Sequence, residues 1–137
     1  MNGVFVDTGA WYALVDSDDA EHTAAAAFLA ANTIPLITTN FVFSETITLI
    51  RYRIGHEAAC SFGQKLKESS FVRVVTVTIA DEERAWEIFC KYRDQDFSFV
   101  DCTSFAVIER IKLSTAFAFD RHFSVMKFAV VPGKDVK

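Results

Sequence analysis

The chain has few of the residues that interrupt, cross-link or anchor a fold. Five glycines and two prolines among 137 residues exclude low-complexity sequence and a scaffold built mainly of loops. The three cysteines (Cys60, Cys90 and Cys102) are widely spaced, form no metal-binding or redox motif, and are expected to remain reduced thiols. No apolar run approaches the roughly 18 residues that a membrane-spanning helix needs. We therefore expect no association with a membrane.

Neither sign of charge dominates the composition. Fourteen Lys and Arg stand against eighteen Asp and Glu, and the net charge of -4 excludes both a basic protein that coats nucleic acid and an acidic disordered tail. The first residues carry no basic stretch, and Asp7 follows too early for a signal peptide. With 51% hydrophobic residues, residues 1–137 are expected to form one cytoplasmic domain with a substantial core.

Short apolar runs alternate with longer helical patterns along the chain. Strands are predicted at residues 3–6, 34–37, 71–77, 115–119 and 128–131, and helices at residues 11–14, 21–31, 41–54, 56–68, 81–92 and 101–113. Asn40 is expected to cap the helix that follows it. Strands that alternate with helices indicate a parallel sheet with helices on both faces. The sequence therefore predicts an α/β fold, a three-layer α/β/α sandwich.

Two of the predicted strands are followed by an aspartate. Asp7 comes after Val4-Phe5-Val6, and Asp120 comes after Ala118-Phe119. Ligands of parallel α/β sheets bind beyond the carboxyl ends of the strands, where both side chains are expected. An aspartate in this position is also a frequent turn or cap residue. For either residue alone, both interpretations remain open.

Two further acids lie on predicted helices. The residues three and four positions from Glu45 are mostly apolar, so its carboxylate needs a partner, either a base such as Arg51 or Arg53 or a cation. Asp101 begins a predicted helix, where it serves as a plain N-cap or as part of a site. Asp96, five residues earlier, could brace a loop or a neighbouring ligand.

Taken together, these acids predict a metal site. Acids and bases balance at fourteen each outside the four proposed ligands, Asp7, Glu45, Asp101 and Asp120. Four carboxylates in one place repel and raise one another's pKa unless a divalent cation neutralises them. Oxygen ligands without Cys or His favour Mg²⁺ or Mn²⁺ over Zn²⁺. Such a site suits hydrolysis of a phosphodiester by a metal-activated water.

The four acids lie in four motifs that follow one another along nearly the whole chain. These are Val4-Phe5-Val6-Asp7-Thr8, Phe43-Ser44-Glu45-Thr46, Asp96-Phe97-Ser98-Phe99-Val100-Asp101-Cys102-Thr103-Ser104-Phe105 and Phe119-Asp120-Arg121-His122-Phe123. In this order they resemble the PIN domain, the nuclease fold of VapC-like toxins from bacterial and archaeal toxin–antitoxin pairs. One departure is Val100, where many members have Thr or Ser, which leaves Thr8 and Thr103 as nearby hydroxyls.

The resemblance implies a metal-dependent endoribonuclease with the strand order 3-2-1-4-5. It implies that Asp7, Glu45, Asp101 and Asp120 are catalytic and bind Mg²⁺ or Mn²⁺. It also implies a homodimer held by a small antitoxin protein, and a structured RNA substrate such as transfer or ribosomal RNA. Two alternatives stay open: an RNA-processing nuclease without a toxin role, and a PIN module that binds RNA or protein without cutting.

Basic residues are candidates for contacts with RNA phosphates. Four of them could form a rim near the site, although solvated helix faces explain them equally well (Arg51, Arg53, Lys65 and Lys67). Arg121 directly follows a proposed ligand and could hold a phosphate or pair with an acid.

Other aromatic and reactive side chains are interpreted outside the metal site. Trp11 and Tyr12 are interpreted as part of an aromatic surface for a partner. The three histidines are too scattered for a metal cluster, and His122 is expected to pack beside Phe123 in a turn. Cys102 lacks a good histidine base, so packing explains it better than nucleophilic catalysis.

Overall fold

Five short parallel strands form the centre of the structure, a computed structural model that describes residues 2–133. The strands are β1 (Val4–Val6), β2 (Leu36–Thr39), β3 (Val72–Val75), β4 (Thr115–Phe117) and β5 (Ala129–Val131). The helices are α1 (Thr8–Val15), α2 (His22–Ala31), α3 (Asn40–Arg53), α4 (His56–Glu68), α5 (Ile79–Lys91), α6 (Phe99–Ile111) and α7 (His122–Val125). The short helix α7 was not among the predicted elements.

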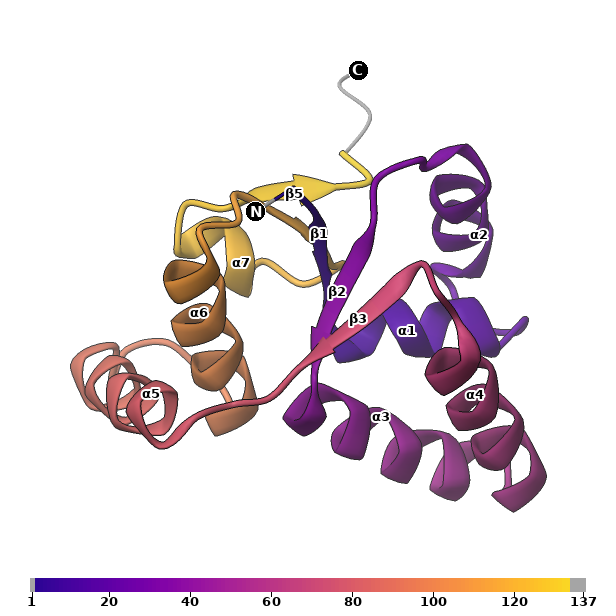
Figure 1. Cartoon of the computed structure of the whole chain (residues 1–137), viewed down its shortest axis with the longest axis horizontal. Coiled ribbons are helices and arrows are strands. Elements are labelled where there is room, and N and C mark those ends of the chain that lie inside the picture. The colour runs from indigo at the N-terminus through magenta and orange to yellow at the C-terminus, as the bar shows by residue number, and fades with distance from the viewer. Residues whose placement is uncertain (1, 134–137) are drawn as a thin grey trace.

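Helices cover both faces of the sheet, as Figure 1 shows, with α1 to α4 on one side and α5 to α7 on the other. The strand order is β3-β2-β1-β4-β5, and every neighbouring pair is parallel. The chain moves outward from β1 to β3 and then returns to β4 and β5. Right-handed crossovers place the helices of these two halves on opposite faces. The predicted sandwich and its strand order 3-2-1-4-5 are confirmed.

The central strand β1 is buried from both sides. Phe5 pairs in register with Ile37 of β2 and Ala116 of β4, and it is fully buried. On one face the ring of Phe105, from α6, packs edge-on against Phe123 with ring centroids 5.1 Å apart. Burial on both faces explains why β1 is a short uninterrupted apolar run and why the two buried residues of β4, Ala116 and Phe117, are apolar.

Strands β1 and β4 end side by side. The backbone N–H of Asp7 donates a hydrogen bond of 3.1 Å to the carbonyl oxygen of Phe117. The strand order reverses between these two strands, since β1 leads outward to β2 while β4 lies on its other side. Open α/β sheets form a crevice at such a point, outside the carboxyl ends of the strands. The fold thus directs attention to the residues that follow β1 and β4.

The predicted cap of α3 was wrong by one residue. Thr39, the last residue of β2, is the N-cap, and its hydroxyl accepts a 3.0 Å hydrogen bond from the N–H of Val42. Asn40 instead accepts a 2.8 Å hydrogen bond from the N–H of Val77 through Oδ1. A threonine hydroxyl at the strand end can cap because the backbone there is still extended.

The predicted aromatic partner surface was also wrong. Trp11 and Tyr12 are each only 5% exposed. The indole N–H of Trp11 donates to the hydroxyl of Thr38 at 3.2 Å, and the Tyr12 hydroxyl donates to the carboxylate of Asp16 at 2.6 Å. Both rings lie inside because α1 packs beside α3 and covers the sheet.

The remaining expectations about the chain concern membranes and thiols. None of the helices that the structure describes has the length and apolar character needed to cross a bilayer. All three cysteines are free, with Cys60 and Cys90 exposed and Cys102 buried.

Candidate active site

Asp7 is the most buried of the four predicted acids. It follows β1, occupies the N-cap position of α1 without capping it through its side chain, and is 4% exposed. Burial raises the pKa of the Asp7 carboxyl well above its ordinary value. The negative charges of Asp120, Asp101 and Glu45 raise this pKa further, against the opposing hydrogen bond from the Thr8 backbone. The four acids are therefore coupled electrostatically at one edge of the sheet.

Asp101 is held rigidly in the first turn of α6. That helix begins at Phe99, two residues before the predicted start, because Ser98 is its N-cap. Ser98 and Asp101 form a capping box, in which each side chain accepts a 3.0 Å hydrogen bond from the other's N–H. The interpretation of Asp101 as the N-cap itself was wrong. Burial raises the pKa of its carboxyl, and the nearby charge of Asp120 adds to this effect.

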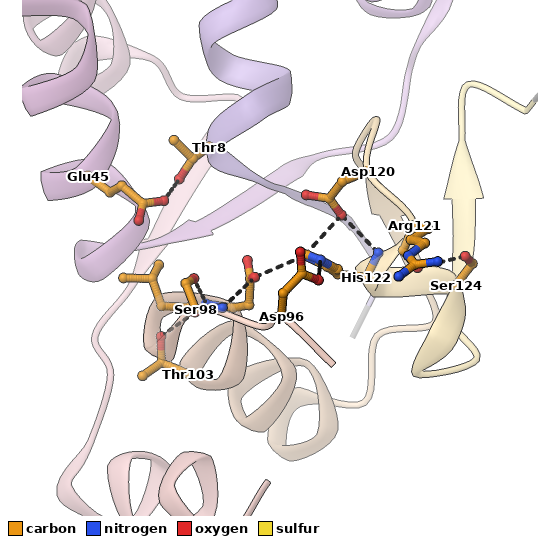
Figure 2. Close-up of polar contacts among 11 residues, drawn as sticks. Thr8, Glu45, Asp96, Ser98, Thr103, Asp120, Arg121, His122 and Ser124 are labelled. Carbon is orange, nitrogen blue, oxygen red and sulfur yellow. Dashed lines mark hydrogen bonds and ion pairs between the residues drawn. The ribbon is translucent and has the colours of Figure 1, made fainter. Parts of the chain in front are cut away.

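Glu45 is tied to the end of β1 by a hydroxyl. Figure 2 shows the side chains of Thr8 and Glu45 pointing toward each other, with the Thr8 hydroxyl donating to Glu45 Oε1 at 2.6 Å. Among residues 2–133, neither Arg51 nor Arg53 forms an ion pair with Glu45. The half-buried carboxylate of this helix therefore faces the other acids rather than a base of its own helix.

Asp120 forms a turn interaction and lies close enough to two other acids to affect them. Its Oδ1 accepts a 3.0 Å hydrogen bond from the N–H of His122, which is a turn interaction of the predicted kind. Its charge also raises the pKa of Asp7 and of Asp101. With a side chain 42% exposed, Asp120 is the most solvent-accessible of the three aspartates.

His122 is the site residue whose role the sequence interpretation missed. Its Nε2 lies 2.9 Å from Asp96 Oδ1, and its Nδ1 lies 3.1 Å from Asp101 Oδ2 and 3.7 Å from Asp120 Oδ1 (Figure 2). The Nδ1 contacts are close in distance but do not have hydrogen-bond geometry. The ring stands edge-on to buried Phe97, with centroids 5.3 Å apart. His122 thus contacts acids from three segments, rather than only packing beside its neighbour in a turn.

The surroundings of His122 favour its charged form. Burial alone lowers the pKa of an imidazole, but the hydrogen bond that His122 donates to Asp96 and the charges of Asp120 and Asp101 outweigh burial and raise the pKa of His122. Asp96, whose role was left open, is the partner that braces this histidine. In the sequence, the contact of His122 with the site was indicated only by its position two residues after Asp120, which places both residues in the same turn.

Carboxylates gather at this edge, yet they do not form a ready-made ligand cage. Within residues 2–133, no three His, Cys, Asp or Glu side chains are arranged as they stand to hold one metal ion. Two of the acids are engaged elsewhere, since Glu45 accepts from Thr8 and Asp101 contacts His122. Both contacts of Asp101, with Ser98 and with His122, use Oδ2.

Several nearby groups have clear structural roles. The Thr103 hydroxyl donates to the carbonyl oxygen of Val100 at 2.7 Å, so Thr8 is the hydroxyl that contacts an acid of the site. Burial raises the pKa of the Cys102 thiol to about 11, which agrees with a packing role. Arg121 is exposed and forms none of the ion pairs in the described part of the chain.

A groove with a volume of about 730 Å³ adjoins the site. Glu45 lines one part of it, and Tyr52 and Arg53 line another. Of the four bases proposed as a rim, Arg53 alone lines this groove; Arg51 and Lys67 line a separate pocket between α3 and α4.

Comparison with known proteins identifies the class to which this chain belongs. The family model of the PIN domain matches residues 4–129, and the chain belongs to this family of nucleases. The predicted resemblance and the predicted enzyme class are confirmed. Nucleases of the family generally use divalent metal ions.

Individual relatives lie within one group of the family. The 23S rRNA-specific endonuclease VapC20 of Mycobacterium tuberculosis is 41% identical over 128 residues, which cover 93% of this chain and 97% of that protein. Ribonuclease VapC26 of the same species is 25% identical over 136 residues, covering 94% of this chain and all of the relative (100%).

Solved structures agree with this placement. The crystal structure of M. tuberculosis VapC20, described as a Sarcin-Ricin loop cleaving toxin, has a TM-score of 0.87 at 40% identity and covers 92% of this chain and 96% of that one. FitAcB from Neisseria gonorrhoeae, with a TM-score of 0.70, 14% identity and coverage of 93% and 95%, shows the fold alone.

The crowding of acids predicts a pH-dependent cost to stability. Because the pKa of Asp7 is raised in the folded state, the metal-free protein loses stability as the pH rises from the unfolded value of about 3.9 through the folded pKa. We expect Asp7→Asn to raise the unfolding temperature in EDTA at neutral pH, and this gain to vanish at acid pH where Asp7 is protonated. Thermal unfolding monitored by circular dichroism measures both.

The matched control is Asp18→Asn, which removes the same charge from an exposed loop position. It should leave the unfolding temperature near that of the wild type at both pH values. An equal rise for Asp7→Asn and Asp18→Asn would show that net charge, rather than the local crowding, sets the effect.

Proposed function

We propose that this protein is a metal-dependent endoribonuclease of the VapC type that hydrolyses RNA phosphodiester bonds. The observation that carries the proposal is Asp7, whose carboxyl pKa is raised by burial and by the charges of three other acids at the edge where the strand order reverses. The 41% identity to an rRNA-specific endonuclease over 93% of the chain supports the same activity. All four acids are present, which favours cleavage over binding alone.

We further propose that the four acids bind Mg²⁺ or Mn²⁺. Carboxylate oxygens are the ligands that these hard cations prefer. Burial and the charges of neighbouring acids raise the pKa of Asp7 and of Asp101, and a divalent cation would offset both effects. The present contacts of two acids each use one oxygen, because Thr8 donates to Glu45 Oε1 and both contacts of Asp101 use Oδ2. The proposed ligands are Asp7, Glu45, Asp101 and Asp120.

The residues of the site divide the work of hydrolysis. When bound, the divalent cation supplies an activated water and stabilises negative charge on the leaving oxygen. Asp7 and Asp101 hold the reacting centre from two rigid supports, the end of β1 and the capping box of α6. Thr8 orients Glu45 through their 2.6 Å hydrogen bond. His122, braced by Asp96, orients Asp101 and supplies a counter-charge.

The biological setting is proposed from the relatives. An rRNA-cleaving relative described as a toxin favours ribosomal RNA as substrate and a toxin role, with a small co-encoded antitoxin as partner. Such a toxin acts in the cytoplasm, and residues 1–137 serve as one PIN domain. Exposed apolar side chains on α5 support self-association as a homodimer (Ile79, Trp86 and Phe89).

Charge-removing substitutions test the catalytic proposal. Asp7→Asn and Asp101→Asn keep the shape of each side chain but remove a ligand charge. We expect each to lower the rate of RNA cleavage by about 100-fold or more, since metal-ion catalysis contributes several kcal/mol and each 1.36 kcal/mol is tenfold. Asp120→Asn should cost less because its carboxylate is the more exposed. Single-turnover cleavage of ribosomal RNA in Mg²⁺ or Mn²⁺ measures these rates.

Asp18→Asn is again the control and should cut at the wild-type rate, because an exposed charge is screened over about 8 Å at physiological salt. EDTA should abolish cutting by the wild-type protein. Cleavage that persists in EDTA, or that Asp7→Asn and Asp101→Asn both retain at the wild-type rate, would contradict the proposed chemistry.

Expression in bacteria tests the toxin role. We expect the wild-type chain to arrest growth when expressed alone, Asp101→Asn to have no such effect, and the small protein encoded beside it to relieve the arrest. Sequencing of RNA 5′ ends after brief induction should reveal a dominant new end in 23S rRNA. Normal growth with abundant, soluble and active enzyme would instead support an RNA-processing role.

A further inference from the structure

Tyr52 presents an aromatic ring to solvent at the C-terminal part of α3. At 82% exposure it is far more open than an ordinary tyrosine of a folded domain. In the part of the chain that the structure describes, its ring packs on no other aromatic ring and its hydroxyl forms no hydrogen bond. Nothing in the described fold therefore accounts for an aromatic residue at this position.

The ring lies in the groove that leads into the candidate active site. The groove has a volume of about 730 Å³ and is lined by residues of α3 together with Val100 of α6. Glu45, a proposed metal ligand, lines it as well, and Val100 directly precedes Asp101. Tyr52 lies seven positions after Glu45, a rise of about 10 Å along the helix. The groove is thus continuous with the reacting centre.

The chemistry of the groove differs along its length. The acids lie near the N-terminal part of α3, whereas Arg53 supplies a positive charge next to Tyr52. The Arg53 guanidinium lies 5.1 Å from the centre of the Tyr12 ring, which anchors it at this end. Two exposed hydroxyl residues also line the groove: Ser44 beside Glu45, and Thr48 between Glu45 and Tyr52. In one groove, an aromatic ring can stack on a nucleotide base, a guanidinium can bind a phosphate, and hydroxyls can hydrogen-bond to the sugar.

We propose that this groove binds an unpaired nucleotide of the RNA substrate next to the bond that is cut, with its base stacked on Tyr52 and its phosphate beside Arg53. The inference rests on the proposed ribonuclease function and adds how the substrate is selected. Stacking requires a splayed-out base, so the groove selects loops or single strands over continuous duplex. Aromatic stacking contributes about 1–3 kcal/mol per base, enough to change affinity about 5- to 150-fold.

Binding and cleavage with Tyr52 variants test the proposal. Binding is measured in EDTA, where the RNA stays intact, by fluorescence anisotropy of a labelled single-stranded RNA of about 12 nucleotides. Tyr52→Ala should weaken binding about tenfold and raise KM more than it lowers kcat in the presence of Mg²⁺ or Mn²⁺. Tyr52→Phe and Tyr52→Trp should keep wild-type affinity, because a ring is retained. A fully paired RNA should show no difference between Tyr52→Ala and wild type.

Phe71→Ala is the matched control. Phe71 is another partly exposed aromatic residue, at 40%, but it lies at the amino end of β3, whereas the candidate site lies at the carboxyl ends of the strands. It should leave RNA affinity and KM unchanged, and the unfolding temperature of Tyr52→Ala should equal that of the wild type because so exposed a ring contributes little to stability.

Two outcomes overturn the inference. If Tyr52→Ala binds and cuts single-stranded RNA like the wild type, the groove is not a nucleotide subsite. If Tyr52→Ala leaves RNA binding unchanged but abolishes relief of growth arrest by the co-encoded protein, the groove serves a polypeptide instead. A wild-type chain that cuts no RNA at all refutes the proposed function itself, and the binding measurement in EDTA distinguishes the two failures.

Discussion

Repulsion among carboxylates at the carboxyl edge of the sheet is the constraint on which the site depends. Asp7 is almost completely buried, and three other acids raise the pKa of its carboxyl. Such an arrangement lowers the stability of the folded protein, and costs of this kind are expected at functional sites. The fold tolerates it because each acid is carried by a well-supported element: pairing of β1 with β4, the capping box of α6 and the hydroxyl of Thr8. This cost to stability agrees with a site that binds divalent cations.

His122 moderates this repulsion in the metal-free protein. It is the one basic side chain that forms ion pairs with the acids of the site in residues 2–133, and it contacts Asp96, Asp101 and Asp120. Burial lowers the pKa of the imidazole, but the hydrogen bond to Asp96 and the charges of Asp120 and Asp101 outweigh it and raise the pKa, which favours the charged form. The same contact occupies Asp101, and cation binding and the present position of His122 are therefore linked.

The sequence was sufficient to predict the architecture and the proximity of the four acids. Strand and helix patterns alternate clearly, and this pattern together with the resemblance led to a parallel sheet with the order 3-2-1-4-5. Asp7 and Asp120 are brought to one edge because both follow parallel strands, a consequence of topology that needs no side-chain detail. Asp101 could be placed on its helix, but its position within the capping box depended on Ser98, a residue just before the predicted helix start.

Features that depend on tertiary contacts could not be predicted from the sequence. Trp11 and Tyr12 resemble surface aromatics until α1 is packed beside α3, where both become buried. Asn40 is a good cap in isolation, yet Thr39 takes that role and Asn40 binds the backbone of Val77, 37 residues away. The contacts of His122 depend likewise on a loop 26 residues earlier in the chain.

The most direct test of the account is a calorimetric titration of Mg²⁺ or Mn²⁺ into the metal-free protein, repeated in buffers of different ionisation enthalpy. If the acids form a cation site, binding is saturable. At a pH below the raised pKa of Asp7 or His122, binding also releases protons, because the cation displaces the protons bound to these groups. Asp7→Asn should weaken the binding and reduce the number of protons released. A wild-type protein that binds neither ion, or that binds them as Asp7→Asn does, would contradict the central claim.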